Sequence, residues 1–350
     1  MTTAPNPTPS PNPTPSLNPA PGTAPSRAVP AATSGLLLAL LSAAGFGTSG
    51  AFAKSLIEAG WSPGAAVTVR IGGAALVLAV PTLLALRGRW GVLRRHGRML
   101  VLYGVVAMAA CQLFYFEAVS RLQVGVALLL EYLAPVLLVA WTWLRTGRRP
   151  ARLTVVGSMV SMLGLVLVLD LTGAIDLDLV GVAWALGAAV TVVVYFVLSA
   201  REHDELPAIA MAGAGMVVAT LTLLAAGLVG VMPLRASASD VTFLDRQVHW
   251  LVPAAGLIVL STALAYVLGI GAARRLGSQL ASFVGLTEVL CAVLFAWLLL
   301  GELPVPIQLV GGLLIVAGIG CIRAQELRAV PALSPDEDLR PASGRGPRSD

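Results

Sequence analysis

Residues 124–144 read VGVALLLEYLAPVLLVAWTWL, a run of 21 residues with a single charge, Glu131, and a proline, Pro135, near its middle. A helix that crosses the hydrocarbon core of a bilayer needs about 20 predominantly apolar residues, so this run has the length of one crossing. A carboxylate inside a crossing is energetically costly and by default indicates a functional site. The stretch therefore predicts a membrane helix that carries a functional acid.

Apolar runs of similar length cover most of the chain. The sequence of 350 residues is 57% hydrophobic and only 12% charged, whereas soluble domains carry roughly 25% charged residues. Too few polar residues remain to solvate a globule of this length. We therefore predict an all-α membrane protein, surrounded by the lipid bilayer, with ten transmembrane helices near residues 34–57, 64–86, 98–119, 124–144, 153–171, 179–200, 208–232, 250–273, 277–300 and 305–322.

The basic residues are distributed unevenly between these runs. With the N-terminus inside, 18 of the 23 Lys and Arg residues fall in segments on the inner side and three in segments on the outer side. In membrane proteins the cytoplasmic loops carry the excess of Lys and Arg. The sequence therefore predicts a multi-pass protein of the inner (plasma) membrane with both termini in the cytoplasm.

The two halves of the chain repeat each other. A shift of 154 residues aligns them without a gap and matches Arg121 with Arg275, Trp143 with Trp297, Gly157 with Gly311 and Gly164 with Gly318. Each half then holds five spans, an odd number, so the second half enters the membrane in the opposite orientation. Such inverted repeats are typical of secondary transporters. We assign residues 34–171 to the first five-helix repeat and residues 172–322 to the second.

The two ends of the chain differ from the repeats in composition. Residues 1–33 contain ten prolines and a single charge, Arg27, while residues 323–350 are rich in charged residues. Segments of this kind bury too little apolar surface to fold, so we expect two disordered cytoplasmic tails. The first tail also lacks the basic start and adjoining apolar run of a signal peptide, so the first span is expected to be an uncleaved anchor.

Five ionisable residues lie within the predicted spans, namely Lys54, Arg70, Glu117, Glu131 and Glu288. At a rise of about 1.5 Å per residue, Arg70 and Glu131 lie roughly 10 Å from the outer boundary, and Glu288 lies roughly 16 Å from the inner one. An inverted repeat brings the two glutamates of the midplane together around a central cavity. Arg70 either contacts the substrate or forms a structural ion pair with Glu131.

Pro135 bears on the same site. A proline inside a helix frees the carbonyl group four residues earlier, here that of Glu131, and bends the helix. The alternative is a kink that serves packing alone. The equivalent position in the second half is Val289, so this feature is not expected to be symmetric.

Polar side chains on neighbouring spans face the same region in this arrangement. We predict that the substrate-binding residues are Glu288, Glu131, Arg70, Tyr132, Tyr266, Gln112, Tyr115 and Thr262. Hydrogen bonding between helices explains each of the uncharged members equally well when it is taken singly.

Other motifs give no sign of a cofactor. Residues 45–50 read GFGTSG and match the dinucleotide-binding pattern, but they lie in an apolar run with no preceding strand, so close helix packing explains them better. Three cysteines and three histidines are too scattered for a metal site. The net charge of +5 is spread over loops without interleaved aromatic residues, so no nucleic-acid partner is expected.

Several motifs resemble a known family. Residues 129–135 (LLEYLAP), 287–288 (TE), 300–302 (LGE) and 308–312 (QLVGG) resemble the EamA-type drug/metabolite transporter superfamily. Residues 53–56 (AKSL), 69–70 (VR) and 260–264 (LSTAL) are similar to the threonine/homoserine exporters. The resemblance covers about residues 34–322 and implies ten spans, a central cavity and the export of amino acids or related metabolites. Residues 147–148 (GR) depart from the Gly-Glu pair that this family often shows.

These observations predict a secondary active transporter that exports small metabolites, amino acids above all, by alternating access. The predicted spans hold two cations against three carboxylates, and the surplus carboxylate takes up either a proton or a cationic substrate group. Proton antiport would follow if Glu288 alternated between the two. The alternatives are a multidrug or other metabolite exporter of the same fold, a membrane-embedded enzyme and a non-transporting scaffold. A homo-oligomer is compatible with the sequence.

Overall fold

The computed structural model describes residues 28–122, 124–169, 178–201, 206–244, 246–300 and 303–329. Helices occupy most of these residues. In chain order the elements are α1 (Ala28–Gly47), α2 (Ser49–Glu58), α3 (Pro63–Ala85), α4 (Gly91–Arg95), α5 (Gly97–Leu102), η1 (Tyr103–Ala110), α6 (Cys111–Val119), α7 (Val124–Glu131), α8 (Ala134–Thr146), α9 (Arg152–Val168), α10 (Leu179–Ser199), α11 (Ala208–Leu228), β1 (Val241–Phe243), β2 (Arg246–Val248), α12 (Leu251–Ile258), η2 (Val259–Leu264), α13 (Ala265–Gly285), α14 (Thr287–Leu300) and α15 (Pro306–Ala329).

The described helices have the dimensions and surface of membrane spans. Eight helical stretches are long and apolar enough to cross a membrane, namely Thr33–Glu58, Pro63–Ala85, Gly97–Val119, Val126–Thr146, Leu179–Ser199, Ala208–Leu228, Leu251–Gly285 and Pro306–Gln325. Large aliphatic side chains point outward, and Leu76, Leu144 and Leu228 are 77%, 82% and 86% exposed. An apolar surface of this extent meets lipid rather than water. The fold is that of a multi-pass α-helical membrane protein.

Two regions are divided differently from the predicted spans. The span predicted at 153–171 is a shorter helix, Arg152–Val168, of 17 residues. The region of the spans predicted at 250–273 and 277–300 is assigned as a helical stretch, Leu251–Gly285, followed by α14, but this stretch consists of two helices that meet at a kink beside the predicted gap. Gly277 interrupts this stretch with φ 77° and ψ 163°, a backbone conformation that is essentially restricted to glycine. The gap that the sequence predicts between residues 273 and 277 therefore ends at the residue where the structure divides the two helices.

The first and last helices extend beyond the predicted boundaries. α1 begins at Ala28, inside the tail predicted over 1–33, and α15 continues to Ala329, inside the tail predicted over 323–350. Alanine, glutamine, leucine and arginine favour the helix, so α15 continues past its last apolar turn. The rest of both predicted tails, residues 1–27 and 330–350, lies outside the described residues.

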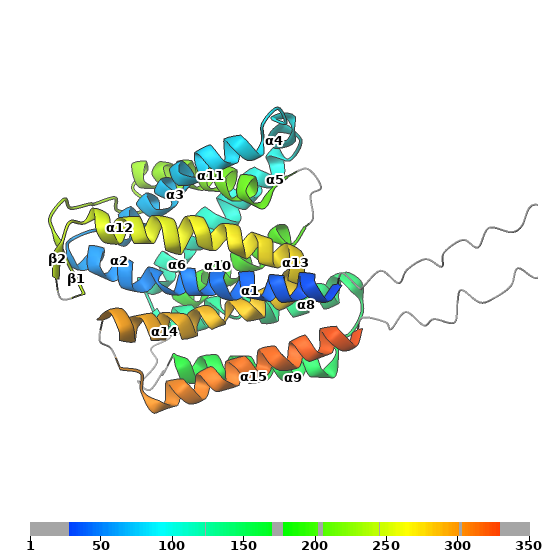
Figure 1. Ribbon diagram of the computed structural model, residues 1–350. Helices are drawn as coiled ribbons and strands as arrows, with labels where there is room; N and C mark the ends of the chain where they lie inside the picture. The colour runs from blue at the N-terminus through cyan, green and yellow to red at the C-terminus, as the bar shows by residue number, and fades with distance from the viewer. Residues whose placement is uncertain are drawn as a thin grey trace, which may run out of the picture.

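The helices run alongside one another as a bundle (Figure 1). The start of α1 and the end of α15 lie at the same end of this bundle, together with α4 and α5. The β1–β2 hairpin lies at the opposite end, with Val241 paired to Val248 and Phe243 to Arg246. Both ends of the described chain therefore face the same side.

The predicted small-residue packing of α1 is visible in its contacts. A Cβ atom added at Gly47 would lie 2.6 Å from the Cβ atom of Cys291 in α14 and 2.9 Å from the backbone nitrogen of Ala292. One added at Gly45 would lie 2.9 Å from the carbonyl oxygen of Leu260 in η2. Glycines at 45 and 47 therefore let two helices approach α1 closely, as the packing interpretation of this motif requires.

Two helices change from α to π hydrogen bonding. η1 covers Tyr103–Ala110, and a shift of 154 residues carries these positions onto residues 257–264, which contain η2. In η2 the Thr262 Oγ1 atom donates a hydrogen bond of 2.7 Å to the carbonyl oxygen of Leu257, five residues earlier. π segments inside α-helices frequently occur at functional sites. Both π segments lead directly into helices whose first residues face the interior of the bundle.

Candidate functional site

A cavity of about 460 Å³ lies inside the bundle, where α1, α3, α6, α7, α10, α13 and α14 meet. Its wall combines ionised groups with phenols, hydroxyls and aromatic rings. The polar and charged lining residues are Ser42, Ser49, Arg70, Cys111, Gln112, Tyr115, Glu131, Tyr132, Tyr195, Tyr266, Ser282 and Glu288. The volume falls in the range of small-molecule sites, and the polar groups are few enough to orient one solute.

The structure brings together seven of the eight predicted site residues. The cavity is lined by Glu288, Glu131, Arg70, Tyr132, Tyr266, Gln112 and Tyr115. Thr262 is fully buried in η2, away from the cavity wall, and its hydroxyl group is used inside its own helix. Thr262 lies four residues before Tyr266 and inside the π segment Val259–Leu264, and it is absent from the cavity lining that includes Tyr266.

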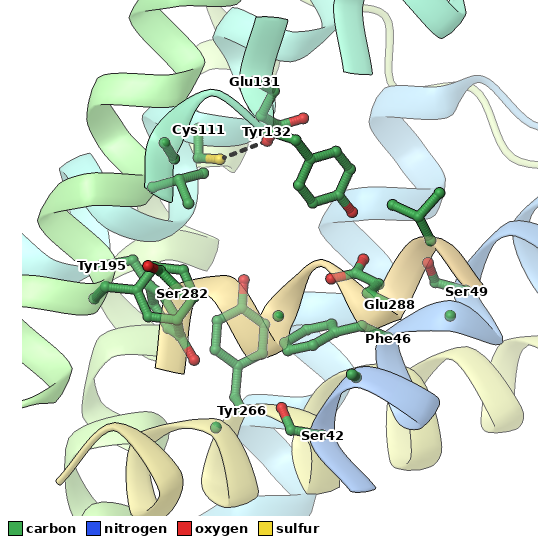
Figure 2. A pocket seen from close by; sticks show the side chains of 18 of the residues that line it. Ser42, Phe46, Ser49, Cys111, Glu131, Tyr132, Tyr195, Tyr266, Ser282 and Glu288 are labelled. Carbon is green, nitrogen blue, oxygen red and sulfur yellow. Dashed lines mark hydrogen bonds between the residues drawn. The ribbon is translucent and has the colours of Figure 1, made fainter. Parts of the chain in front are cut away.

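The two carboxylates are placed at helix ends. Glu131 is the last residue of α7, and its Oε1 atom accepts a hydrogen bond of 3.4 Å from the Cys111 Sγ atom. Glu288 lies in the first turn of α14, where the amide groups of a helix N-terminus favour a negative charge. Figure 2 shows the Tyr132 ring between the two carboxylates, with its hydroxyl group directed toward Glu288. The two acids therefore line one cavity, but the Tyr132 ring separates it into two sectors, one around Glu131 and one around Glu288.

Both carboxylates sit beside an interruption of their helix. Tyr132 and Leu133 separate α7 from α8, and Pro135 lies in the first turn of α8, where its missing N–H group costs nothing. Leu286 separates α13 from α14. Beside it, the Thr287 hydroxyl group donates a hydrogen bond of 2.7 Å to the carbonyl oxygen of Val284. A shift of 154 residues carries the first break onto the second. The expectation of an asymmetric bend was therefore wrong, because Leu286 and Thr287 form a break without a proline.

Arg70 projects from α3 into the same cavity. Its Nε atom is buried and has no hydrogen-bond partner within the described residues. The described part of the chain contains no ion pair between Arg70 and either glutamate at 4.0 Å or less, although Arg70 is close enough to interact electrostatically with both. Within the described residues this buried Nε donor is therefore left unsatisfied, which is uncommon for a buried polar atom.

Aromatic rings form the opposite side of the cavity. Phe46 and Tyr266 meet edge to face with ring centroids 4.9 Å apart, and Tyr195 meets Tyr266 in the same manner at 5.8 Å. Figure 2 shows Phe46 and Tyr266 below Glu288, with Ser42 beneath them and Tyr195 to one side. These rings present apolar surface to the aliphatic part of a solute and negative ring faces to a cation.

The other charged residues of the predicted spans lie outside the cavity. Glu117 pairs with Arg121 at 3.1 Å, and both side chains are 36% exposed. Lys54 is exposed and does not line the cavity. Among the described lining residues, the cavity therefore holds one guanidinium group, Arg70, against two carboxyl groups, Glu131 and Glu288.

The prediction missed several lining residues, chiefly Ser42, Phe46, Ser49, Cys111 and Ser282. The internal repeat is a signal for other lining residues that the prediction left out. Six pairs related by the shift of 154 residues line the cavity from both halves, namely Gln112 and Tyr266, Tyr115 and Gly269, Leu128 and Ser282, Glu131 and Gly285, Ala134 and Glu288, and Pro135 and Val289. Applying the shift to the predicted site would have added Gly269, Gly285 and Ala134, the counterparts of Tyr115, Glu131 and Glu288. The α1 residues have no such signal, because their spacing reads only as packing.

The fold and this cavity define a class, the multi-pass membrane proteins that enclose a solute-sized polar site between helices. The described residues contain no group of three His, Cys, Asp or Glu side chains that could hold a metal ion. The chain belongs to the EamA-like transporter family, whose model matches residues 33–170 and again residues 179–324. It is therefore a multi-pass transporter of the inner membrane type, with a small molecule as its substrate.

Individual relatives agree with this assignment. The chain is 28% identical over 293 residues to the threonine/homoserine exporter RhtA of Escherichia coli, covering 81% of this chain and 89% of RhtA. It is 24% identical over 272 residues to the uncharacterized inner membrane transporter YicL of Salmonella typhimurium, covering 76% of this chain and 87% of YicL. One solved crystal structure shares the fold with a TM-score of 0.67 at 19% identity, over 85% of this chain and 99% of that chain.

Proposed function

We propose that this protein is a secondary active transporter that exports amino acids or closely related small metabolites across the inner membrane. The observation that carries the proposal is that the Arg70 side chain, whose Nε atom is buried, lines one cavity together with two glutamates. An amino acid carries one carboxylate and one ammonium group, so Arg70 can bind the first and Glu131 or Glu288 the second. The exporter RhtA, 28% identical to this chain, acts on two amino acids according to its name.

The transport mechanism in this proposal is alternating access between two inverted repeats, residues 34–171 and 172–322. Three features support it: the equivalent π segments η1 and η2, the equivalent helix breaks at 132–133 and 286, and the six lining pairs related by the same shift. A two-fold relation that passes through a central site is the arrangement that lets one half rock against the other. In this proposal α9 and the pair of helices divided at Gly277 complete ten spans.

We further propose that both termini are cytoplasmic. The ends of the described chain lie at the same end of the bundle, beside the arginine-rich α4. The hairpin end carries few basic residues. An excess of arginine marks the cytoplasmic side.

Proton antiport is the coupling that the cavity supports. One negative charge remains after Arg70 is set against one glutamate, and a surplus buried carboxylate needs either a proton or a cation. Glu288 is assigned this role, because Glu131 already accepts a hydrogen bond from the Cys111 Sγ atom. Binding of the substrate ammonium group would release the proton, and departure of the substrate would restore it.

Reconstituted transport tests the proposal. Purified full-length protein in liposomes loaded with an unlabelled amino acid should take up the labelled compound by exchange, and Arg70→Gln should lose at least roughly tenfold in rate, because a charged donor is removed from a buried site. Arg121→Gln is the matched control, since Arg121 is exposed and pairs only at the rim. If the protein exchanged hydrophobic cations but no amino acids, it would be assigned to the multidrug exporters instead. Binding of no small molecule would favour a scaffold.

A further inference from the structure

The charges of the cavity are not balanced by an ordinary amino acid. Among the described lining residues, Arg70 is the one guanidinium group and Glu131 and Glu288 are the two carboxylates. A zwitterion adds one charge of each sign, so it leaves the surplus negative charge unchanged. A solute with one net positive charge removes it without a proton.

The two carboxylates also differ in their neighbours. Glu131 shares its sector with Arg70 and with the Cys111 thiol group, whose hydrogen bond fixes the Oε1 atom. This sector offers a cation and an anion together, which is what the carboxylate and ammonium groups of an amino acid head require.

Glu288 has different surroundings. It lies across the cavity from Glu131, with Tyr132, Phe46 and Ser49 around it, and no lysine or arginine of the described lining other than Arg70. Arg70 acts electrostatically on Glu288 as well as on Glu131, so Glu288 is left among neutral groups once an amino acid head occupies Arg70 and Glu131. That is a site for a single positive group, separate from the head.

The surface between the two sectors is aromatic and apolar. Phe46 and Tyr266 stand edge to face at 4.9 Å, and both line the cavity beside Glu288. Such a surface packs against a short chain of methylene groups, and ring faces attract a cation at the end of that chain. The wall is thus suited to a stem that joins two charged ends.

We propose that the cavity selects α-amino acids that carry a second ammonium group on their side chain. This inference rests on the proposed transport function. Arg70 and Glu131 hold the amino acid head, and Glu288 binds the side-chain ammonium group at the far end of the aromatic wall. A neutral amino acid in the same cavity leaves Glu288 without a cation.

Matched substrates test this selection. Lysine and norleucine share a carbon chain, and lysine adds a terminal ammonium group; diaminobutyrate and homoserine differ by an ammonium group in place of a hydroxyl group. Exchange rates are measured for each with full-length protein in liposomes, without a pH gradient. The ammonium member of each pair should be favoured roughly tenfold, as expected for one buried charge-assisted hydrogen bond.

Substitutions at Glu288 connect the preference to the proposed residue. Glu288→Gln should bring the ratio of the two exchange rates within each pair to near one. Glu288→Asp keeps the charge, so it should retain most of the preference. This second variant also controls for a general loss of function on substitution at this position. If neutral members are exchanged as fast as their partners by the wild type, or if Glu288→Gln keeps the preference, the selection by charge is wrong and the exporter function stands. If none of the compounds is exchanged, the proposed function itself fails.

Discussion

Gly157 and Gly318 meet backbone to backbone between α9 and α15. A Cβ atom added at Gly157 would lie 2.7 Å from the carbonyl oxygen of Gly318, and one added at Gly318 would lie 2.5 Å from the carbonyl oxygen of Gly157. Gly164 and Gly311 repeat this contact at 2.6 and 2.5 Å. As the number rises along α9 it falls along α15, so the two helices pack antiparallel.

The same four glycines are the ones that the internal repeat aligns. The shift of 154 residues carries Gly157 to Gly311 and Gly164 to Gly318, yet each glycine contacts the copy of the other. A two-fold axis between antiparallel helices produces this crossed pattern, because it exchanges the two contacts. The pattern is a further argument for the proposed inverted repeats, and it gives α9 and α15 a shared role in joining the two halves.

This close contact predicts that alanine is not tolerated at Gly318. Its Cβ atom would collide with the Ser161 hydroxyl group and the Gly157 carbonyl group, and overpacking of this kind typically costs about 1–3 kcal/mol. Gly318→Ala should lower the melting temperature of the detergent-solubilised protein by several degrees or more. Gly320→Ala is the control on the same helix, since nothing lies within 4 Å of a Cβ atom there. Equal melting temperatures for the two variants would contradict the tight α9–α15 seam.

The sequence predicted the number and order of the apolar regions better than the residues at which individual helices begin and end. Hydropathy found each apolar region, because lipid imposes a minimum length of apolar helix that few other structures share. It placed a gap between 273 and 277 because of the two arginines at 274 and 275, but the backbone stays helical there until Gly277. The two arginines therefore predicted the approximate position of the loop between two spans. The backbone conformation of Gly277 sets the residue at which the helix is interrupted.

The charged residues of the cavity were easier to predict from the sequence than its uncharged residues. Glu131, Glu288 and Arg70 were found because an ionisable group in an apolar run is conspicuous. Phe46 and Ser42 were missed because aromatic and hydroxyl residues serve packing and helix capping as often as binding. Thr262 was assigned to the cavity on α-helical spacing, but it lies inside a π segment and is absent from the cavity lining.

Labelling of introduced cysteines tests the proposed orientation. In a background without Cys111, Cys291 and Cys321, a cysteine at Ser237 near the hairpin end should react with an impermeant thiol reagent in intact cells, as should one at Thr172. Cysteines at Gly91 and Ala151 should react only after the cells are opened, because arginine-rich segments stay in the cytoplasm. Labelling of Gly91 in intact cells would reverse the assigned orientation.

Deletion of the proline-rich segment tests its predicted independence. Residues 1–26 precede the first described helix and have almost no large apolar side chains to bury. We expect the truncated protein to keep its melting temperature and its exchange rate, because a segment of this composition adds little packing. A large loss of folded protein in size-exclusion chromatography would show that the segment docks on the bundle.

The last prediction concerns the coupling carried by Glu288. Glu117 pairs with Arg121 outside the cavity, and the charged residues of the described cavity lining are Arg70, Glu131 and Glu288. If Glu288 holds a proton whenever it holds no substrate cation, each transport cycle moves a proton against the substrate. Glu288→Gln cannot release a proton, although its amide group preserves the shape of the side chain.

Glu288→Gln should therefore insert and melt like the wild type yet fail to accumulate substrate when a pH gradient is imposed across the liposome membrane. Glu117→Gln serves as the matched control, because this carboxylate lies outside the cavity and its loss removes only an exposed ion pair worth little. The measurement compares gradient-driven accumulation with exchange in the absence of a gradient for both variants. Accumulation by Glu288→Gln at the wild-type level would return Glu288 to a binding or packing role, since a side chain that cannot release a proton cannot carry one across the membrane.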